Sequence, residues 1–166
     1  MVSIKFTYDY DSAFLPIYRE FFESEFTGRE WFDRIKYITN EVLEYRLQKR
    51  LLDRKLDDTQ MPLMVIYNDD IPVGMSFPRN TFTDEEKSKF EVNDFDYYKI
   101  GSIIILKKFR NKGIAYEACK LFLAQYNPIV YHVDVKNKAS IKLAEKLGLS
   151  LSHSSVLNEV LYLIYK

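Results

Sequence analysis

Hydrophobic and polar positions alternate along the first residues of the chain. Ile4, Phe6 and Tyr8 are separated by Lys5 and Thr7, a period of two that is typical of a strand with one buried face. Further along, apolar residues recur at steps of three and four, which indicates amphipathic helices. The pattern therefore predicts a chain that mixes strands and helices.

Two helices are predicted after the first strand. The first has an apolar stripe made of Phe14, Ile17, Tyr18, Phe21 and Phe22. The second starts at the capping-box sequence Thr27-Gly28-Arg29-Glu30 and runs to about Leu56, where Asp57-Asp58-Thr59 ends it. Its apolar stripe is predicted to contain Trp31, Ile35, Ile38, Val42 and Tyr45.

A hairpin and a polar segment follow. Leu63–Tyr67 and Ile71–Phe77 are predicted strands, and Asn68-Asp69-Asp70 is the turn between them. From Arg79 to Asp96 the chain becomes polar and rich in acidic residues, so we predict a solvated loop. The alternative is an acidic surface that attracts a cationic substrate.

The second half of the chain alternates strands with helices. Apolar runs predict strands at Ile100–Leu106 and Ile129–Val135, and two later strands are predicted around Leu151–Leu157 and Val160–Tyr165. One helix opens at Gly113, and another is capped by Asn137 and closed by Gly148. The strand, helix and strand around Gly113 imply two neighbouring parallel strands in an otherwise antiparallel sheet.

This order of elements predicts the α+β class. We expect a mixed, mostly antiparallel central sheet of about seven strands, flanked by about four helices. A length of 166 residues without a repeat, a linker or a low-complexity segment predicts a single domain over residues 1–166.

Composition narrows the function classes. Lys plus Arg and Asp plus Glu both number 24, and this balance argues against a dedicated nucleic-acid binder. No apolar run has the length of a signal peptide core or a membrane span, which predicts a cytoplasmic protein without a membrane partner. Cys119, His132 and His153 are scattered, so no metal site or disulfide is predicted, and Cys119 is expected in the core rather than as a nucleophile.

The junction between the predicted strand Ile100–Leu106 and the next helix is a candidate anion site. A turn that feeds a helix points several unpaired backbone N–H groups at one place, and the helix dipole adds positive potential there. Gly113 and Ala115 keep the turn small, while Arg110 and Lys112 add positive charge. The alternative is an ordinary turn with a helix-opening glycine.

Two motifs in this half resemble the GCN5-related N-acetyltransferase (GNAT) superfamily. The sequence Arg110-Asn111-Lys112-Gly113-Ile114-Ala115 looks like the pyrophosphate loop of that family. The sequence Asn137-Lys138-Ala139-Ser140-Ile141-Lys142-Leu143-Ala144-Glu145-Lys146-Leu147-Gly148-Leu149 is most similar to the subgroup of ribosomal-protein N-terminal acetyltransferases. The resemblance implies an acetyltransferase, that is, a transferase of the acyltransferase class with acetyl-CoA as cosubstrate.

The resemblance also implies where coenzyme A binds. The site would lie between the fourth and fifth strands, which run parallel and splay apart in this fold. Backbone groups near Ile104, Ile105 and Leu106 would pair with the pantetheine arm as an added strand would. Backbone N–H groups from Asn111 to Ala115 would hold the pyrophosphate, and Asn137 would either bind the arm or only cap its own helix.

The catalytic groups implied by the family are only partly present. Many members carry a tyrosine, as proton donor to the leaving thiolate, at the position of Ala144, whereas Ser140 is the candidate donor here. The predicted strand Ile100–Leu106 holds no carboxylate, so Asp134, or Tyr98 with a water, is the candidate acceptor of the amine proton.

The acceptor is expected to be a primary amine of a small molecule or a protein N-terminus. Two alternatives stay open: a non-catalytic acyl-CoA-binding or interaction module on the same fold, and an unrelated nucleotide-phosphate binder. A homodimer is also left open by the sequence.

Overall fold

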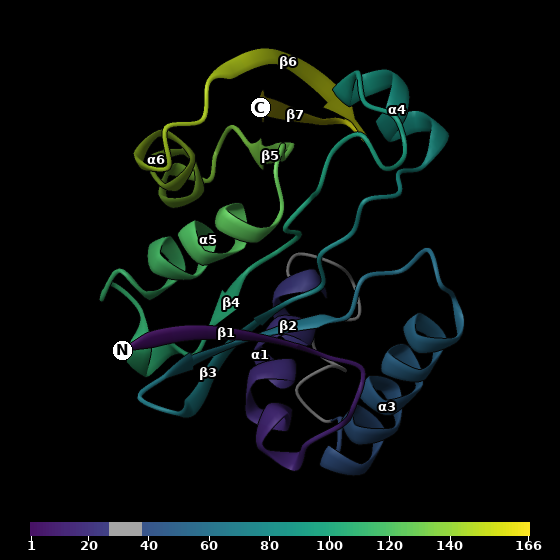
Figure 1. Cartoon of the computed structure of the whole chain (residues 1–166), viewed down its shortest axis with the longest axis vertical. Helices are drawn as coiled ribbons and strands as arrows, with labels where there is room; N and C mark the ends of the chain where they lie inside the picture. The colour runs from purple at the N-terminus through teal and green to yellow at the C-terminus, as the bar shows by residue number, and fades with distance from the viewer. Residues whose placement is uncertain (27–37) are drawn as a thin grey trace. The chain divides into compact units, whose positions relative to one another are not determined.

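The computed structural model describes residues 1–26 and 38–166 (Figure 1). The chain divides into two compact units, each made of two segments: Met1–Phe77 with Ser102–Ile114, and Pro78–Gly101 with Ala115–Lys166. The single domain over residues 1–166 stays a prediction. The predicted capping box at Thr27–Glu30, together with Trp31 and Ile35, lies outside the described residues.

The first unit contains a four-stranded antiparallel sheet in the order β1-β2-β3-β4. The strands are β1 (Val2–Thr7), β2 (Leu63–Asn68), β3 (Ile71–Ser76) and β4 (Ile104–Ile105). Asp69 and Asp70 form the turn between β2 and β3 with φ of 50° and 64°, a left-handed backbone that Asp tolerates. The predicted hairpin is therefore confirmed.

Helices α1 (Leu15–Phe26) and α3 (Asn40–Leu56) pack against each other, and α1 also contacts β3 and β4 (Figure 1). A short 3-10 helix, η1 (Ser12–Phe14), precedes α1. The Thr39 hydroxyl caps α3 by accepting a hydrogen bond from the backbone N–H of Val42, and the helix ends before Asp57, as predicted.

The predicted apolar stripe of α3 is wrong in its phase. Val42 and Tyr45 are 42% and 66% exposed, whereas the buried side chains are Leu43, Leu47 and Leu51. The three leucines recur at steps of four over about two turns, and they form the face of α3 that packs on the core. They pack with the buried residues of α1, β2 and β3.

The predicted strand Ile100–Leu106 is shorter than expected. Gly101 has φ of 83°, which interrupts the extended backbone, and the regular ladder begins only at Ile104. Gly74 lets β3 approach β4 closely, because a Cβ there would lie 2.6 Å from Cδ1 of Ile105 and 2.7 Å from the carbonyl oxygen of Ile104.

The second unit contains a three-stranded antiparallel sheet in the order β5-β7-β6. The strands are β5 (Tyr131–Asp134), β6 (Leu151–Leu157) and β7 (Val160–Tyr165), and the last two have the predicted bounds. Helix α5 (Ile114–Gln125) starts at the last residue of the first unit, and α6 (Lys138–Lys146) follows β5. Gly148, with φ of 77°, lies just beyond the end of α6, as predicted.

The segment Arg79–Asp96 is not the loop that we predicted, because it contains helix α4 (Asp84–Phe90). Thr83 and Glu86 form a complete capping box, with the Thr83 hydroxyl accepting from the N–H of Glu86 and the Glu86 carboxylate accepting from the N–H of Thr83. Glu86 is only 7% exposed, so this acidic residue is not solvated.

The predicted parallel pairing around the α5 crossover is confirmed at one bridge. Tyr98 donates its backbone N–H to the carbonyl of Pro128 at 2.9 Å, and Val130 donates to the carbonyl of Tyr98 at 2.8 Å. Beyond this bridge, β4 pairs with β3 and β5 pairs with β7, so the two strands belong to different sheets. The α+β class is confirmed, with seven strands and five α-helices in the described residues.

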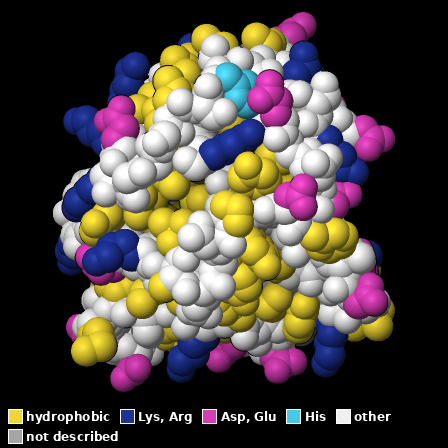
Figure 2. Space-filling view, turned by 45° about the horizontal axis from the view of Figure 1, so that its top comes forward, with side chains coloured by type: hydrophobic (Ala, Val, Ile, Leu, Met, Phe, Trp, Pro, Cys, Tyr) yellow, Lys and Arg dark blue, Asp and Glu magenta, His cyan; other side chains and the backbone are white. Residues whose placement is uncertain are grey.

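Surface charges of both signs are interspersed on the face that Figure 2 shows. This distribution fits the balanced composition of the chain. Among the described residues, no helix combines the length and the apolar character that crossing a membrane requires.

Candidate functional site

The turn before α5 has two residues in the left-handed backbone region. A 3-10 helix, η2 (Lys107–Phe109), leads into it, and then Asn111 and Gly113 have φ of 60° and 76°. No atom lies within 4 Å of where a Cβ of Gly113 would be, so this position needs glycine for its conformation rather than for space. The turn delivers the first N–H groups of α5, which have no acceptors within the helix, to an open place.

This turn also concentrates positive charge. Lys107, Lys108, Arg110 and Lys112 fall within six consecutive residues of the sequence. The ammonium groups of Lys108 and Lys112 lie 5.2 and 5.4 Å from the ring centroid of Phe109, which holds them beside the turn. Together with the helix dipole, these cations make a favourable environment for an anion such as a diphosphate.

The Arg110 guanidinium makes two hydrogen bonds to other residues of the first unit. Its Nε donates to the carbonyl of Ile105 at 2.7 Å, and a terminal nitrogen donates to Oε2 of Glu20 at 2.8 Å. These bonds fix the turn to β4 and to α1, so Arg110 positions the turn. Its direct contact with a ligand stays a prediction.

Strand β4 is at the edge of its sheet, and its register shows which backbone groups face outward. Leu106 donates its N–H to the carbonyl of Val73 at 2.9 Å, so the neighbouring opposed pair, Ile105 and Gly74, is a pair without hydrogen bonds between its members. The N–H and the carbonyl of Ile105 therefore point away from β3. The carbonyl accepts a hydrogen bond from Arg110. The Ile105 N–H is therefore the group of this pair that could donate a hydrogen bond to an extended ligand.

By the same alternation, Ile104 and Leu106 direct their backbone hydrogen-bonding groups toward β3. Of the three residues predicted to pair with a pantetheine arm, Ile105 is thus the one whose groups face the open edge. The sequence could not show this, because the phase of the pairing depends on the register with β3.

Asn137 and Asp134 shape the connection between β5 and α6 in the second unit. Oδ1 of Asn137 accepts from the N–H of Ser140 at 3.1 Å, which confirms Asn137 as the cap of α6. Oδ1 of Asp134 accepts from the N–H of Lys136 at 2.9 Å, a local bond that orders the turn. The contact of Asn137 with a ligand and the proton-accepting role of Asp134 stay predictions.

Tyr131 is a candidate functional residue that the sequence analysis missed. It opens β5 and is 9% exposed, and Ser140 in the first turn of α6 is one of the groups that affect the pKa of its phenol. Burial raises the pKa of Tyr131, and Ser140 opposes this only in part, so the phenol is protonated at neutral pH. The sequence could have pointed to Tyr131, because it is the first residue of the strand that precedes the helix of Ser140.

Tyr98, the remaining candidate catalytic residue, is not hydrogen-bonded to the other candidates among the described residues. Tyr98 is fixed by the parallel bridge, and its ring lies 5.1 Å from the ring of Tyr126. No hydrogen bond joins Tyr98 to Asp134 or Ser140 in the part of the chain that the structure describes. Residues Ile104 to Ile114 belong to the first unit, whereas Tyr98, Ala115, Asp134, Asn137 and Ser140 belong to the second.

Cys119 is unsuited to nucleophilic chemistry. It is fully buried, and burial raises its pKa to about 12, so the thiol stays protonated. Ala144, one turn after Ser140 on α6, is also fully buried. Across residues 1–26 and 38–166, no group of three His, Cys, Asp or Glu side chains could hold a metal ion.

Residues 16–150 match the family model described as an acetyltransferase (GNAT) domain. Among solved structures, the chain is similar to an aminoglycoside acetyltransferase, AAC(6')-Ib, in complex with coenzyme A, with 12% identity, coverage of 99% and 93% of the two chains, and a TM-score of 0.70. It is also similar to a ribosomal L7/L12 α-N-protein acetyltransferase in complex with coenzyme A, with 13% identity, coverage of 99% and 92%, and a TM-score of 0.64.

A third similar structure is yncA of Salmonella typhimurium with its cofactor acetyl-CoA, with 16% identity, coverage of 99% and 91%, and a TM-score of 0.61. Identities this low establish a shared fold. No curated protein sequence matches the chain significantly.

Proposed function

Because the chain belongs to the GNAT acetyltransferase family, we propose that it transfers the acetyl group of acetyl-CoA to a primary amine. The observation that carries the proposal is the family match over residues 16–150, which includes the basic turn and both helices around β5. One of the similar structures contains acetyl-CoA, and the two others contain coenzyme A. Those two are named for a ribosomal protein and an aminoglycoside, which supports either a protein N-terminus or a small molecule as acceptor.

We propose that the turn before α5 binds the pyrophosphate of coenzyme A. The N–H groups from Asn111 to Ala115 would hold it, and Lys112 would add charge at the same place. The left-handed conformation of Gly113 and the open space around it are what such a contact needs. The N–H of Ile105, facing away from β3, would pair with an amide of the pantetheine arm.

Acetyl-CoA supplies the thioester, and side chains of this protein would accept and donate the protons that the reaction moves. The amine nitrogen forms a bond to the acetyl carbon as the carbon–sulfur bond breaks, so one proton must leave the nitrogen and one must reach the sulfur. We propose Ser140 as the donor toward sulfur, with the protonated phenol of Tyr131 behind it. Asp134, or Tyr98 with a water, is proposed to receive the proton from nitrogen.

The proposal is tested by thermal unfolding with and without acetyl-CoA. At 100 times the Kd, ligand binding adds about 2.7 kcal/mol to the free energy of unfolding. For a chain of this size that corresponds to a rise in Tm of about 5–10 °C. Gly113→Asp is expected to abolish the rise, because it places a carboxylate where the pyrophosphate would bind.

Gly148→Asp is the matched control for this test. Gly148 has φ of 77° and, like Gly113, no atom within 4 Å of its Cβ position, so both variants carry the same backbone strain. Gly148→Asp should keep the acetyl-CoA response. If acetyl-CoA leaves the Tm of the unmodified chain unchanged, the proposal fails.

Thiol release with a panel of amines then separates the enzyme from the non-catalytic module on the same fold. The sequence feature that favours the module is Ala144, where many relatives are expected to carry a tyrosine. Binding of acetyl-CoA without release of coenzyme A over a broad panel would support the module. Competition by ATP but not by coenzyme A would instead indicate a nucleotide-phosphate binder.

A further inference from the structure

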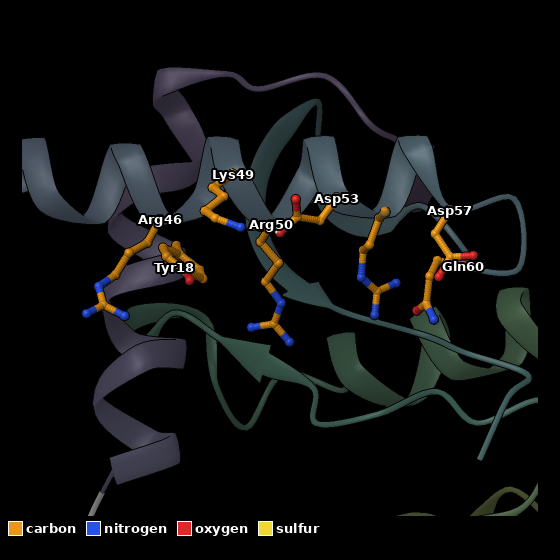
Figure 3. Close-up of a pocket in the computed structure, with 8 residues that line it drawn as sticks. Tyr18, Arg46, Lys49, Arg50, Asp53, Asp57 and Gln60 are labelled. Carbon is orange, nitrogen blue, oxygen red and sulfur yellow. Dashed lines mark hydrogen bonds and ion pairs between the residues drawn. The ribbon is translucent and has the colours of Figure 1, made fainter. Parts of the chain in front are cut away.

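A groove of about 450 Å³ lies along α3 in the first unit (Figure 3). Charged residues of α3 and its C-terminal end form most of its lining: Arg46, Lys49, Arg50, Asp53, Arg54 and Asp57. Figure 3 shows Arg46 and Arg50 extending to the same side of the helix.

The three arginines of the groove rest on buried aromatic rings. The guanidinium carbon of Arg50 is 3.6 Å from the ring centroid of Phe77, and that of Arg54 is 5.1 Å from the same centroid. The guanidinium carbon of Arg46 is 5.3 Å from the centroid of Phe22. A guanidinium that stacks through its face keeps its five N–H donors at its edges, so one existing partner does not exhaust its capacity.

The lining has an excess of positive charge. It contains four cationic side chains and two carboxylates, in a chain whose formal net charge is zero. Lys49 and Asp53 pair at 2.7 Å, and Arg54 donates a hydrogen bond to the carbonyl of Met61. An excess of cationic over acidic side chains in the lining favours an anionic ligand over a neutral or cationic one.

The spacing of the arginines fits an extended chain. Arg46, Arg50 and Arg54 are four residues apart on α3, which separates them by about 6 Å each along the axis. Side chains on one face of an extended peptide are about 6.6–6.8 Å apart, at every second residue. Carboxylates at alternate residues of an extended segment would therefore meet successive guanidinium groups.

The groove also lies near the open edge of the sheet. Phe77, which supports Arg50, follows β3 directly, and Met75 of β3 pairs with Ile104 of β4. Phe77 is thus about 7 Å along the strand from the residue that faces β4. A segment held in the groove has a short path to the edge strand that is proposed to bind the acyl donor.

We propose that this groove binds an acidic, extended peptide segment of the acetyl acceptor, with carboxylates at alternate residues. That the peptide belongs to the acetyl acceptor rests on the proposed function. That the groove binds an acidic peptide rests on the groove itself.

The test measures binding of two fluorescent hexapeptides to the full chain by anisotropy. One alternates Ser and Glu, and the other alternates Ser and Gln. The Glu peptide is expected to bind at least about tenfold more tightly at low salt, and to weaken as salt rises. Equal binding of the two peptides would overturn the proposal.

Arg46→Glu is expected to weaken binding of the Glu peptide by about tenfold or more. Lys55→Glu is the matched control, since it makes the same change of charge on the same helix, at an exposed residue that does not line the groove. It should change the affinity by less than about twofold. Equal losses in the two variants would mean that only net charge matters, and would overturn the site.

Two further outcomes separate this proposal from the proposed function. If the Glu peptide binds but acetyl-CoA causes no rise in Tm, the groove stands and the acetyltransferase fails. If acetyl-CoA raises the Tm and the Glu peptide does not bind, the groove fails alone. Tighter binding of a phosphoserine peptide than of the Glu peptide would overturn the carboxylate assignment.

Discussion

Two groups of cationic side chains, close in sequence, have different partners in the two units. In the second unit, Arg79 and Lys99 both contact the carboxylate of Glu86, with the Lys99 ammonium at 3.2 Å, and all three lie largely out of solvent. In the turn Lys107–Lys112 of the first unit, Arg110 is the one cation that pairs with a carboxylate among the described residues, whereas Lys108 and Lys112 lie beside Phe109. Cations that share a buried carboxylate hold structure together, while cations beside an aromatic ring remain available to a ligand.

The pKa values show how strongly the buried cluster is coupled. Burial alone would raise the pKa of Glu86, but Lys99 and the hydrogen bond from Arg79 lower it to about 2. Burial, with Arg79 nearby, lowers the pKa of Lys99 to about 8. Burial and Lys99 also lower the pKa of His132 to about 3, so its ring is neutral.

The largest expected effect comes from removing the shared carboxylate. Glu86→Gln leaves the buried Lys99 and the partly buried Arg79 without a compensating charge, which is expected to cost about 3–5 kcal/mol of the free energy of unfolding. The Tm should fall by about 6–20 °C, measured by thermal denaturation.

Glu85→Gln is the control, because Glu85 precedes Glu86 on α4 and is exposed. It should change stability by less than about 0.5 kcal/mol. Equal effects of the two substitutions would contradict the view that the buried cluster holds the second unit together.

A smaller effect is expected from His132, and it should depend on pH. The unfolded His132 binds a proton below about pH 6.5, while the folded residue stays neutral down to about pH 3, so stability falls as pH drops through this window. Glu86 adds a further loss between about pH 4.5 and 2, because its folded pKa is below its unfolded value.

His132→Phe should therefore flatten the profile between about pH 6.5 and 5, where the original chain loses about 1–2 kcal/mol. Phenylalanine preserves the packing of the ring, which stacks on Phe90 at 4.8 Å and meets the edge of Tyr162 at 5.1 Å. Urea unfolding at several pH values measures the difference. An unchanged slope in this window would show that the acid sensitivity arises elsewhere.

The smallest effect is expected at the exposed pair that ties the basic turn. Arg110→Gln and Glu20→Gln should each cost about 0.5–1 kcal/mol, and the double variant should cost less than the sum, in urea unfolding. Both should weaken acetyl-CoA binding by similar factors if Arg110 acts by positioning the turn. A loss of affinity confined to Arg110→Gln would instead indicate direct contact with the ligand.

The elements that were predicted well depend on local chemistry. The bounds of β6 and β7 agree with the predicted ones, and α6 is bounded by Asn137 and Gly148, whose roles need only neighbouring backbone. The same kind of signal was present at Thr83 and Glu86, so α4 could have been predicted from its capping box.

Other features could not be predicted because they join distant residues. Arg110 meets Glu20 across 90 positions of the sequence, and the outward phase of Ile105 depends on its register with Gly74. The effect of Ser140 on the pKa of Tyr131 requires the fold to bring β5 beside α6. The aromatic support of the arginines on α3 likewise comes from α1 and from the residue after β3.

The sequence by itself determined the α+β class, the glycine turn before α5 and the family resemblance, because periodicity, caps and turn chemistry act over a few residues. Only the tertiary structure decided which charges are buried together and which face outward. Burial and charge pairing depend on residues brought together from different segments, and no local pattern records that proximity. Glu86 illustrates this: it is one acidic residue among several in the sequence, and in the fold it is the carboxylate that two buried cations share.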